Sequence, residues 1–523
     1  MDKKKLIRSA GTVSFFIFIS RVLGMVREMA MAAFFGSSMT MDAFVWAFRI
    51  PNTFRSLFGE GALTSAFVPV FTEELAKEER QKVWDFSNNM LSFLSVILAA
   101  IVIAGILILS LLKAYWPASE RVLLILYLAR IMLPYMFFIC LAALFAAMLN
   151  SLHRFFMPAA TYAVLNIIML AALCFCPFLD ATGNARILLV AWSVILAGVI
   201  QWLMQVPLLW HCGFRPKLSF NWHDERVRRV WKLMGAAAIG LGATQINVLL
   251  DTLLATVIGP GRASYLYYAD RLVYFPLGFL GTALGTVLLP AFSTHVAQSR
   301  PDLLRQTFNY SFRQLAFLAV PAALGLLALA KPIIQVIYEH GKFTPLSTDM
   351  TALALSIYAP GLIVFSLLKV LIPTFYAHQD IKTPMRIGIA CTCLGLVLKL
   401  IFMWPLKHAG IALATVIVSL IQAVALATLI HRRFGSPGWD SIFNSVLKIC
   451  FAAVVMGIVA YFGNHYCQSA LASYNLSLQI TRIISLAAAI GLAVIVYGAC
   501  ALILRCPEAA EFWSAIRHKT EQA

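Results

Sequence analysis

Long apolar stretches follow one another along this chain of 523 residues, each about twenty residues or more in length and separated by short polar segments. A transmembrane helix needs about 20 apolar residues, and a helix satisfies its own backbone hydrogen bonds in lipid. The pattern therefore predicts an all-α polytopic membrane protein with about fourteen transmembrane helices, not the short alternating segments of a β-barrel. The predicted spans are 7–35, 43–71, 88–113, 122–149, 157–179, 186–210, 231–258, 265–292, 313–338, 351–377, 384–405, 409–431, 442–464 and 480–504.

Basic residues set the expected orientation, because cytoplasmic loops of membrane proteins carry an excess of Lys and Arg. They concentrate on one set of alternate flanks, near residues 3–8, 77–82, 215–232, 300–305, 432–433 and 517–519. With an even number of spans, both termini are then cytoplasmic. The basic N-terminus is not read as a signal peptide, because the apolar run after it is too long and lacks a small-residue cleavage site.

The formal net charge of +18 would indicate nucleic-acid binding in a soluble protein. In a membrane protein it fits basic cytoplasmic loops beside anionic lipid. We therefore expect anionic membrane lipids as partners and no nucleic acid. The ten cysteines include no C-x-x-C pair and the ten histidines lie mostly at span ends or in loops, so no metal site is predicted.

The first twelve spans form an internal repeat. "LPYMFFICLAALFAAMLNSLHRFFMPA" aligns with "APGLIVFSLLKVLIPTFYAHQDIKTPM", and 24 residues separate Pro134 from Pro158 as they separate Pro360 from Pro384. Upstream, "ALTSAFVPVFT" aligns with "ALGTVLLPAFS". Because each half holds six spans, the halves share one orientation and should enclose a central cavity about an axis along the membrane normal.

The repeat divides the chain into three predicted parts. Residues 1–213 form an N-lobe of spans 1–6, and residues 214–433 form a C-lobe of spans 7–12. The C-lobe begins with the basic amphipathic entry helix "DERVRRVWKL", expected on the cytoplasmic surface. Residues 434–523 hold spans 13–14 and a cytoplasmic tail.

Two helix starts carry local signals. Thr344 should cap the tenth span and Pro384 should lie in the first turn of the eleventh.

Charged residues within the predicted spans are the candidate functional residues. A charge at mid-bilayer costs about 2.5–3.5 kcal/mol on insertion scales, so it should face a cavity or a partner. We assign substrate binding to Arg21, Arg27, Arg55, Arg271, Glu28, Glu60 and Lys369, and a gating or supporting role to Asp42, Arg49 and Asp270. Arginine keeps its proton and its planar fork suits phosphate. The excess of cations predicts a phosphate or pyrophosphate substrate; closed internal ion pairs are the alternative.

The first span poses a geometric problem. Arg21 and Glu28 share a helix face about 10.5 Å apart, whereas Arg27 points about 120° away from Arg21. We expect either a bend near Gly24 or a cavity wide enough to expose two helix faces.

A second intramembrane constellation is Asp251 in "INVLLDTLLATV" with Lys399 in "LGLVLKLIFMW". A structural Asp–Lys pair is the favoured interpretation, and ion coupling is the alternative.

These residues lie in motifs that resemble one family, the MurJ (MviN) lipid II flippases of bacteria, in the multidrug/oligosaccharidyl-lipid/polysaccharide exporter superfamily. The motifs are "SRVLGMVRE", "MDAFVWAFRIPNTFRSLFGEGALTSAFVP", "YYADRLVYFPLGFLGTALGTVLLP", "YEHGKFT", "FYAHQDIKTP" and "LKHAG". They run from the first span to the twelfth, in the family's order.

The resemblance implies two six-helix lobes in a V shape, with two extra helices that form a groove for a lipid tail. It implies a transporter, not an enzyme, that moves undecaprenyl-pyrophosphate-linked disaccharide-pentapeptide to the outer leaflet for peptidoglycan synthesis, cell-wall biogenesis and cell shape. It places the protein in the bacterial inner membrane, beside cell-wall synthesis enzymes. By motif position, the cavity residues are Arg21, Arg27, Glu28, Asp42, Arg55, Glu60, Asp270, Arg271 and Lys369.

Three positions depart from the family pattern. Glu28 stands where members often have Asp, and Tyr274 stands where many have a carboxylate. Some members bind sodium between the seventh, eleventh and twelfth spans. Asp251 lies near that place in this chain but so does Lys399, whose ammonium group can take the place of the cation, and no sodium site is predicted.

Transport is expected to proceed by alternating access without a cofactor, with the membrane potential or ions as the energy source, because no nucleotide-binding motif occurs. Three rivals stay open. An exporter of another polyprenyl-pyrophosphate-linked oligosaccharide would share the fold. A drug/cation antiporter should have an acidic cavity, and a membrane glycosyltransferase should have a sizeable outer loop.

Overall fold

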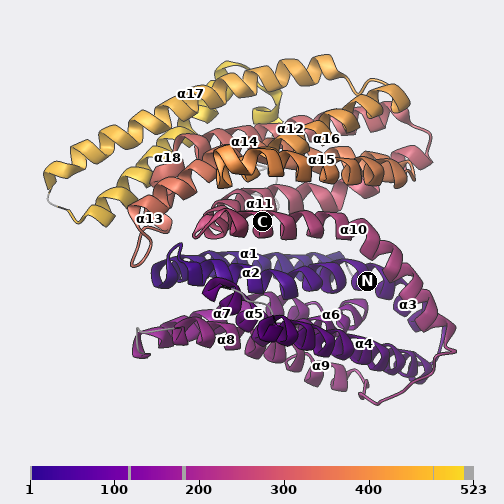
Figure 1. The fold of residues 1–523 in the computed structure, drawn as a ribbon. Helices are drawn as coiled ribbons and strands as arrows, with labels where there is room; N and C mark the ends of the chain where they lie inside the picture. Colours follow the sequence, from indigo (N-terminus) through magenta and orange to yellow (C-terminus); the bar gives the residue numbers. More distant parts are fainter. Residues whose placement is uncertain (1–2, 116–118, 180–183, 475, 512–523) are drawn as a thin grey trace. The chain divides into compact units, whose positions relative to one another are not determined.

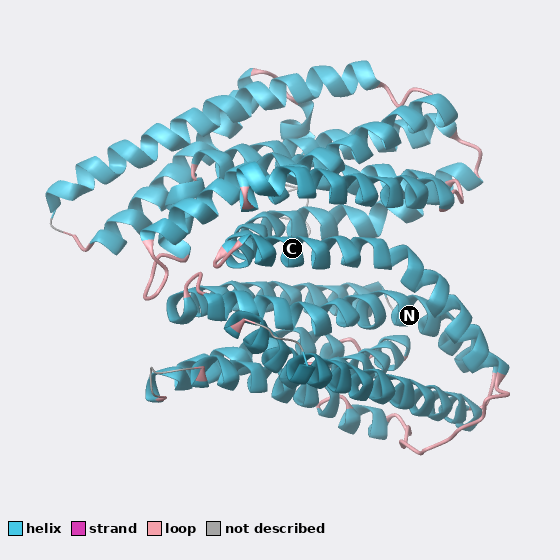
Figure 2. Ribbon diagram, viewed as in Figure 1, coloured by secondary structure: helices cyan, strands magenta, loops and turns pink. Residues whose placement is uncertain are grey.

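The computed structural model of this chain describes residues 3–115, 119–179, 184–474 and 476–511. Side chains are described there except at residues 3–14, 58–60, 236, 239–241, 243–244 and 279–287. Every regular element in this described part is a helix (Figure 2), as the apolar pattern predicts. The contacts divide the chain into two compact units, Met1–Thr256 and Val257–Ala523.

The first unit is built from the indigo-to-magenta helices of Figure 1. They are α1 (Lys3–Phe35), α2 (Met39–Phe54), η1 (Arg55–Ala62), α3 (Leu63–Lys77), α4 (Arg80–Tyr115), α5 (Glu120–Met132), α6 (Tyr135–Ser151), α7 (Phe156–Phe175), η2 (Cys176–Phe178), α8 (Ala185–Leu203), α9 (Val206–His211) and α10 (Glu225–Ile258), whose last two residues fall in the second unit. The segment "DERVRRVWKL" forms no separate entry helix: its residues from Glu225 onward are the first turns of α10.

The second unit follows in chain order and includes the two extra helices. It contains α11 (Arg262–Ala297), α12 (Pro301–Ala328), α13 (Ala330–Ile337), α14 (Pro345–Ala377), α15 (Lys382–Leu406), α16 (His408–Phe434), α17 (Trp439–Leu471), η3 (Ala472–Tyr474) and α18 (Leu478–Ile503). The unit boundary at residue 256 follows contacts, whereas the predicted lobe boundaries at 213 and 433 follow the repeat.

Ten helices among the described residues are long and apolar enough to cross a membrane, so this is a multi-pass membrane protein. They coincide with predicted spans three to six and nine to fourteen. Helices also occupy the other four predicted spans, as α1, α2 to α3, α10 and α11. The count of fourteen crossings stays a prediction.

The packing within each unit follows the predicted repeat. In the first unit, α5 packs on α2, α4 and α8, and α6 packs on α3, α4 and α8. Helix α7 also packs on α8. In the second unit, the corresponding helix α14 packs on α11, α12 and α16, and α15 packs on α16. The same span pairs therefore meet twice, which supports a true repeat over chance similarity among apolar helices.

Several predicted spans are interrupted. The second is divided into α2, the π-helix η1 and α3, and the fourth is broken at Leu133 and Pro134. Proline lacks the N–H that a helix interior needs and clashes with the preceding turn, which accounts for the second break. Thr344 caps α14 by accepting a hydrogen bond from the Ser347 N–H at 3.2 Å, and Pro384 lies in the first turn of α15, both as predicted.

The extra helices are tied to the repeat within the second unit. α17 packs along α12 and along α18, which also contacts α13. Just after α18, the fully buried Glu508 accepts a 2.6 Å hydrogen bond from the Ser445 hydroxyl and pairs with Arg313 at 2.7 Å. This buried contact fixes the segment after α18 to α17 and α12.

Candidate functional site

Apart from Asp251 and Lys399, the predicted intramembrane charges fall on five elements of the two units. The first unit carries them on α1, α2 and η1, and the second unit on α11 and α14. The first unit holds Arg21, Arg27, Glu28, Asp42, Arg49, Arg55 and Glu60, and the second holds Asp270, Arg271 and Lys369. The side chain of Glu60 lies outside the described residues.

Arg27 and Glu28 form a buried ion pair on α1, with 7% and 2% of their surfaces exposed. The other nitrogen of the Arg27 fork, Nη1, donates to Oδ1 of Asn166 on α7 at 2.9 Å. The Asn166 amide donates in turn to the Ser20 carbonyl at 2.9 Å. These bonds join α1 to α7 within the first unit, and the assignment of Arg27 to substrate binding stays a prediction.

Gly24 lies in the same contact between α1 and α7. A Cβ atom at this position would lie 3.7 Å from the Asn166 amide nitrogen, in ordinary van der Waals contact. The helix continues through Gly24 without interruption, and Arg21 is half-buried whereas Arg27 is buried. Arg21 and Arg27 thus lie in different surroundings, in agreement with the angle of about 120° predicted between them on the helix. The bend near Gly24 stays a prediction.

Asp42 is fully buried in the first turn of α2 and pairs with Arg121 of α5 at 2.8 Å. Arg121 also donates to the Thr256 carbonyl of α10 at 2.8 Å. Nearby on α2, Arg49 donates through Nε to the Thr252 hydroxyl at 3.2 Å. Arg121 lies one residue before the fourth predicted span, and no local signal reveals its partner, which lies 79 residues earlier in the chain.

Arg55 begins the π-helix η1 and is half-buried. Its Nε atom donates to Oδ1 of Asn52 at 3.0 Å, which orients the guanidinium group from the preceding turn. π-Helical turns inside α-helices occur frequently at functional sites. Here the turn coincides with "RSLFGEGA", inside one of the motifs that carries the family resemblance.

In the second unit, Arg271 lies over the ring of Tyr267, 4.9 Å from its centroid. Its Nη2 atom also reaches the Tyr267 hydroxyl at 3.4 Å, one turn earlier on α11. Asp270 and Lys369 are half-buried. An arginine held by an aromatic face keeps its full charge, so Arg271 retains the chemistry that phosphate recognition needs.

The predicted pair of Asp251 and Lys399 spans both units. Asp251 lies on α10 in the first unit and is half-buried, and Lys399 lies on α15 in the second unit, with 1% of its surface exposed. Their pairing, and the replacement of a sodium ion by Lys399, stay predictions. Among the described residues, no group of three or more His, Cys, Asp or Glu side chains could hold a metal ion.

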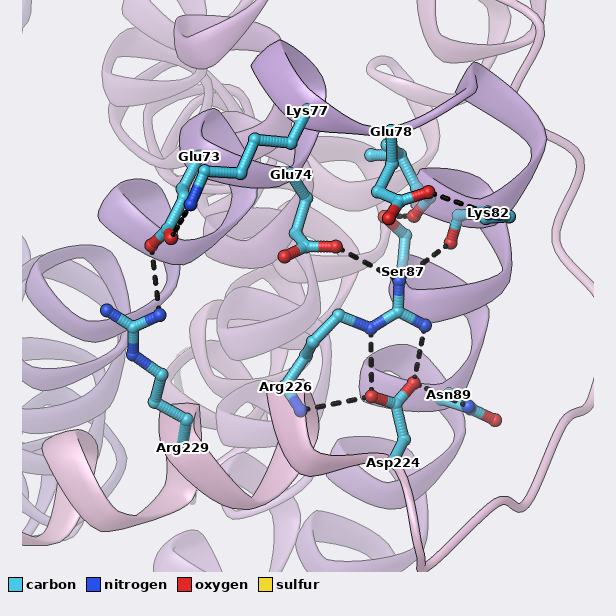
Figure 3. A network of polar contacts seen from close by, with 11 residues as sticks. Glu73, Glu74, Lys77, Glu78, Lys82, Ser87, Asn89, Asp224, Arg226 and Arg229 are labelled. Atoms are coloured by element: carbon cyan, nitrogen blue, oxygen red, sulfur yellow. Dashed lines mark hydrogen bonds and ion pairs between the residues drawn. The ribbon is translucent and has the colours of Figure 1, made fainter.

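A polar network that the sequence analysis missed joins α3, α4 and α10 at the basic end of the first unit (Figure 3). The Arg226 fork holds Asp224 through two bonds of 2.9 Å and contacts Glu74 at 3.2 Å. Arg229 donates to Glu73 at 2.9 Å. The segment before α10 is thereby fastened to the ends of α3 and α4.

The charges of this network shift two pKa values outside the membrane spans. Burial raises the pKa of Asp224, but hydrogen bonds and charge from Arg226 outweigh it, so that pKa lies below its usual value. The pKa of Glu73 is also lowered, by hydrogen bonds from Lys77 and then Arg229. Both carboxylates are therefore ionised at neutral pH.

Comparison with known proteins connects this arrangement to one family. The family model described as "Lipid II flippase MurJ" matches residues 31–481. The probable lipid II flippase MurJ of Vibrio cholerae is 36% identical over 443 residues, which cover 82% of this chain and 84% of that protein. The lipid II flippase MurJ of Burkholderia cenocepacia is 33% identical over 475 residues, covering 88% and 90%.

Solved structures agree in fold. The "Lipid II flippase MurJ, inward closed conformation" superposes with a TM-score of 0.76 at 25% identity, over 94% of this chain and 99% of that one. An inward-facing multidrug resistance MATE transporter superposes with a TM-score of 0.66 at 13% identity, over 81% and 98%. At that identity, the second match bears on the fold alone.

Proposed function

The chain belongs to the lipid II flippase MurJ family, and we propose that it flips lipid II from the cytoplasmic to the outer leaflet by alternating access through a cationic cavity. The observation that carries this proposal is the family match over residues 31–481, which spans all the candidate charges except those in the first span. The curated relatives named above support lipid II over another lipid-linked oligosaccharide as the substrate.

The cavity would hold the pyrophosphate-sugar headgroup while the polyprenyl tail stays in lipid. Arg21, Arg55 and Arg271 are half-buried rather than enclosed, so their forks would replace the hydration of the pyrophosphate oxygens. Arg27 is held by Glu28 and Asn166, and the substrate would compete with Glu28 for its fork. Asp42, Arg49 and Asp270 would act as gate or supporting charges.

The setting of the proposed transport follows from the substrate and from the basic loops. We place the protein in the bacterial inner membrane with both termini cytoplasmic, among anionic lipids. Lipid II is used for peptidoglycan synthesis on the outer side, so cell-wall synthesis enzymes are the proposed partners. As a transporter the protein needs no catalytic residue.

The membrane potential is the proposed energy source. It supplies about 2.3 kcal/mol per elementary charge per 100 mV, enough to bias the two orientations of a charged cavity. An ion gradient is the alternative. Collapsing the potential with an ionophore while the ion gradients are held should stop transport if the potential is the source.

The test replaces Arg271 with Ala in cells depleted of their native flippase and measures lipid II in the outer leaflet. Loss of a charge-assisted hydrogen bond of about 1.5–3 kcal/mol should lower transport about tenfold or more. Arg271→Lys keeps the charge without the fork and should restore only part of it. Arg130→Ala, on α5 outside the candidate set, is the matched control, and membrane levels of each variant are measured by immunoblot. Unchanged transport in Arg271→Ala would refute the arginine cavity.

A further inference from the structure

A pocket of about 490 Å³ lies within the second unit, where α11, α14 and α16 end and α12 begins. Its size falls in the range of small-molecule sites. The pocket shares no residue with the candidate intramembrane charges. By the basic-residue pattern it lies at the cytoplasmic end of these helices.

Three arginines line the pocket together with two histidines, and no carboxylate does. They are Arg300, Arg305, Arg433, His295 and His378. Arg433 is partly neutralised, because it pairs with Asp380 at 2.9 Å. Within the described part of the chain, the guanidinium groups of Arg300 and Arg305 have no hydrogen bond or ion pair. The pocket therefore keeps a net positive charge.

The helix ends alone do not account for this charge. A helix C-terminus carries partial negative charge that basic side chains stabilise. Here, however, α11 and α14 end in the left-handed residues Ser299 and Gln379, with φ of 53° and 61°. The following N–H groups, of Arg300 and Asp380, bond back to carbonyls of the last turns at 3.0 Å each. Backbone N–H groups therefore already satisfy carbonyls in the last turns of α11 and α14. The arginine side chains are not needed for this purpose and are available to a ligand.

The walls of the pocket are preformed. The His378 ring stacks on Phe434 at 3.8 Å, and its Nδ1 atom is hydrogen-bonded to the Thr374 carbonyl at 2.9 Å. The His295 Nε2 atom contacts the Thr307 hydroxyl at 3.2 Å, whereas its buried Nδ1 atom has no partner among the described residues. That nitrogen is a further polar group for a ligand.

The linker to α17 closes one side. Asn309 of α12 donates to the Pro437 and Gly438 carbonyls at 3.2 Å each. Gly438 has φ of 87°, and a Cβ atom there would come within 3.0 Å of the Asn309 amide and 3.6 Å of the Arg305 guanidinium. A glycine is needed at this position for the linker to lie against the arginine rim.

We propose that this pocket is a second anion site, which binds a ligand through a phosphate group. The two arginine forks match phosphate oxygens, and apolar residues such as Phe308 and Ile430 suit a glycerol or acyl portion. The phosphate belongs either to the headgroup of an anionic phospholipid or to a soluble phosphate compound. The site is separate from the proposed lipid II cavity.

The test follows the thermal unfolding of the purified full-length protein in a neutral detergent at constant ionic strength. The probes are inorganic phosphate, a short-chain phosphatidylglycerol and, as the net-neutral control whose phosphate is offset by a choline cation, a short-chain phosphatidylcholine. The variants are Arg300→Gln with Arg305→Gln, and Arg432→Gln as the matched control, because Arg432 is an exposed arginine at the same helix end outside the pocket.

We expect the Tm to rise with ligand concentration until it saturates. The apparent affinity obtained from this curve should be at least about tenfold weaker in the double variant and unchanged in Arg432→Gln. A rise with phosphatidylglycerol alone identifies a lipid headgroup, and a rise with phosphate as well identifies a soluble ligand. No saturable rise with either, or equal affinity in the double variant and the parent, overturns the proposal.

Discussion

The two units pack several of their repeated helices in the same pairs but differ in how they hold the candidate charges. In the first unit, Arg27 with Glu28 and Asp42 with Arg121 form buried pairs within spans. In the second unit, Arg271 lies half-buried on a tyrosine face. The candidate charges of the two units are therefore held in different ways, by buried ion pairs in the first unit and against an aromatic face in the second.

The units also differ in how they continue their helices past the equivalent prolines. The helix is interrupted at Pro134, between α5 and α6, whereas α14 continues through Pro360. The residue after each proline lies at a close approach of two helices: Tyr135 packs against Gly198 of α8, and Gly361 packs against Val416 of α16. In each unit, a glycine therefore permits the close packing at this point.

The largest expected effect is at the buried pair of the first unit. Glu28→Ala should destabilise the protein by about 3–5 kcal/mol, because it leaves the Arg27 charge buried without its carboxylate. Asp270→Ala in the second unit should cost about 1 kcal/mol or less, because that side chain is half-buried. Thermal unfolding in detergent measures both. Equal losses at the two sites would contradict the difference between the units.

Gly198 and Gly361 should lose similar amounts of stability when each is replaced by alanine. A Cβ atom on Gly361 would lie 2.8 Å from Val416 Cγ2, and one on Gly198 would lie 2.7 Å from Tyr135 Cδ2. Each Gly→Ala change should cost about 1–3 kcal/mol through overpacking. Val416→Ala should relieve part of the strain of Gly361→Ala, because the Phe365 ring would still lie 3.0 Å from the added Cβ atom. Gly395→Ala, where the contact of 3.5 Å is ordinary, is the control and should change the unfolding temperature little.

A double-mutant cycle tests whether Asp42 and Arg121 act as a pair. We expect a coupling free energy of about 1.5–3 kcal/mol, because Asp42 is fully buried and pairs with Arg121 at 2.8 Å. Unfolding of Asp42→Ala, Arg121→Ala and the double variant measures it. Arg130→Ala in place of Arg121→Ala should give additive effects; coupling of the same size there would mean that the pair is not specific.

The smallest expected effect is a pH dependence at Asp224. Because its pKa is lowered in the folded state, its contribution to stability is present above the unfolded pKa of about 3.9 and is lost as the pH falls through the folded pKa. Asp224→Asn should therefore be less stable than the parent by about 1 kcal/mol at neutral pH. The difference should shrink below about pH 4. A difference that persists unchanged in acid would show that Arg226 does not stabilise the charged carboxylate.

Arg121 and Asn166 show where sequence reasoning stopped. Arg27 and Asp42 were recognisable as charges within apolar runs, because hydrophobic length is a local property. Their partners come from 139 and 79 residues away in the chain. Each partner by itself looks like an ordinary polar residue of a helix or loop, so no pattern within one helix predicts the pair.

The helical membrane class and local signals such as the Thr344 cap were predictable from the sequence, since each depends on the spacing of residues close together in the chain. The repeat was predictable as well, because its two halves keep similar residues at the same spacing. Tertiary structure alone decided which charges are enclosed and which are half-buried, and it assembled the arginine pocket from residues 295–308, 374–378 and 430–437. The reason is physical: burial and ion pairing depend on the packing of distant helices, and the pattern along a single helix carries no record of its neighbour.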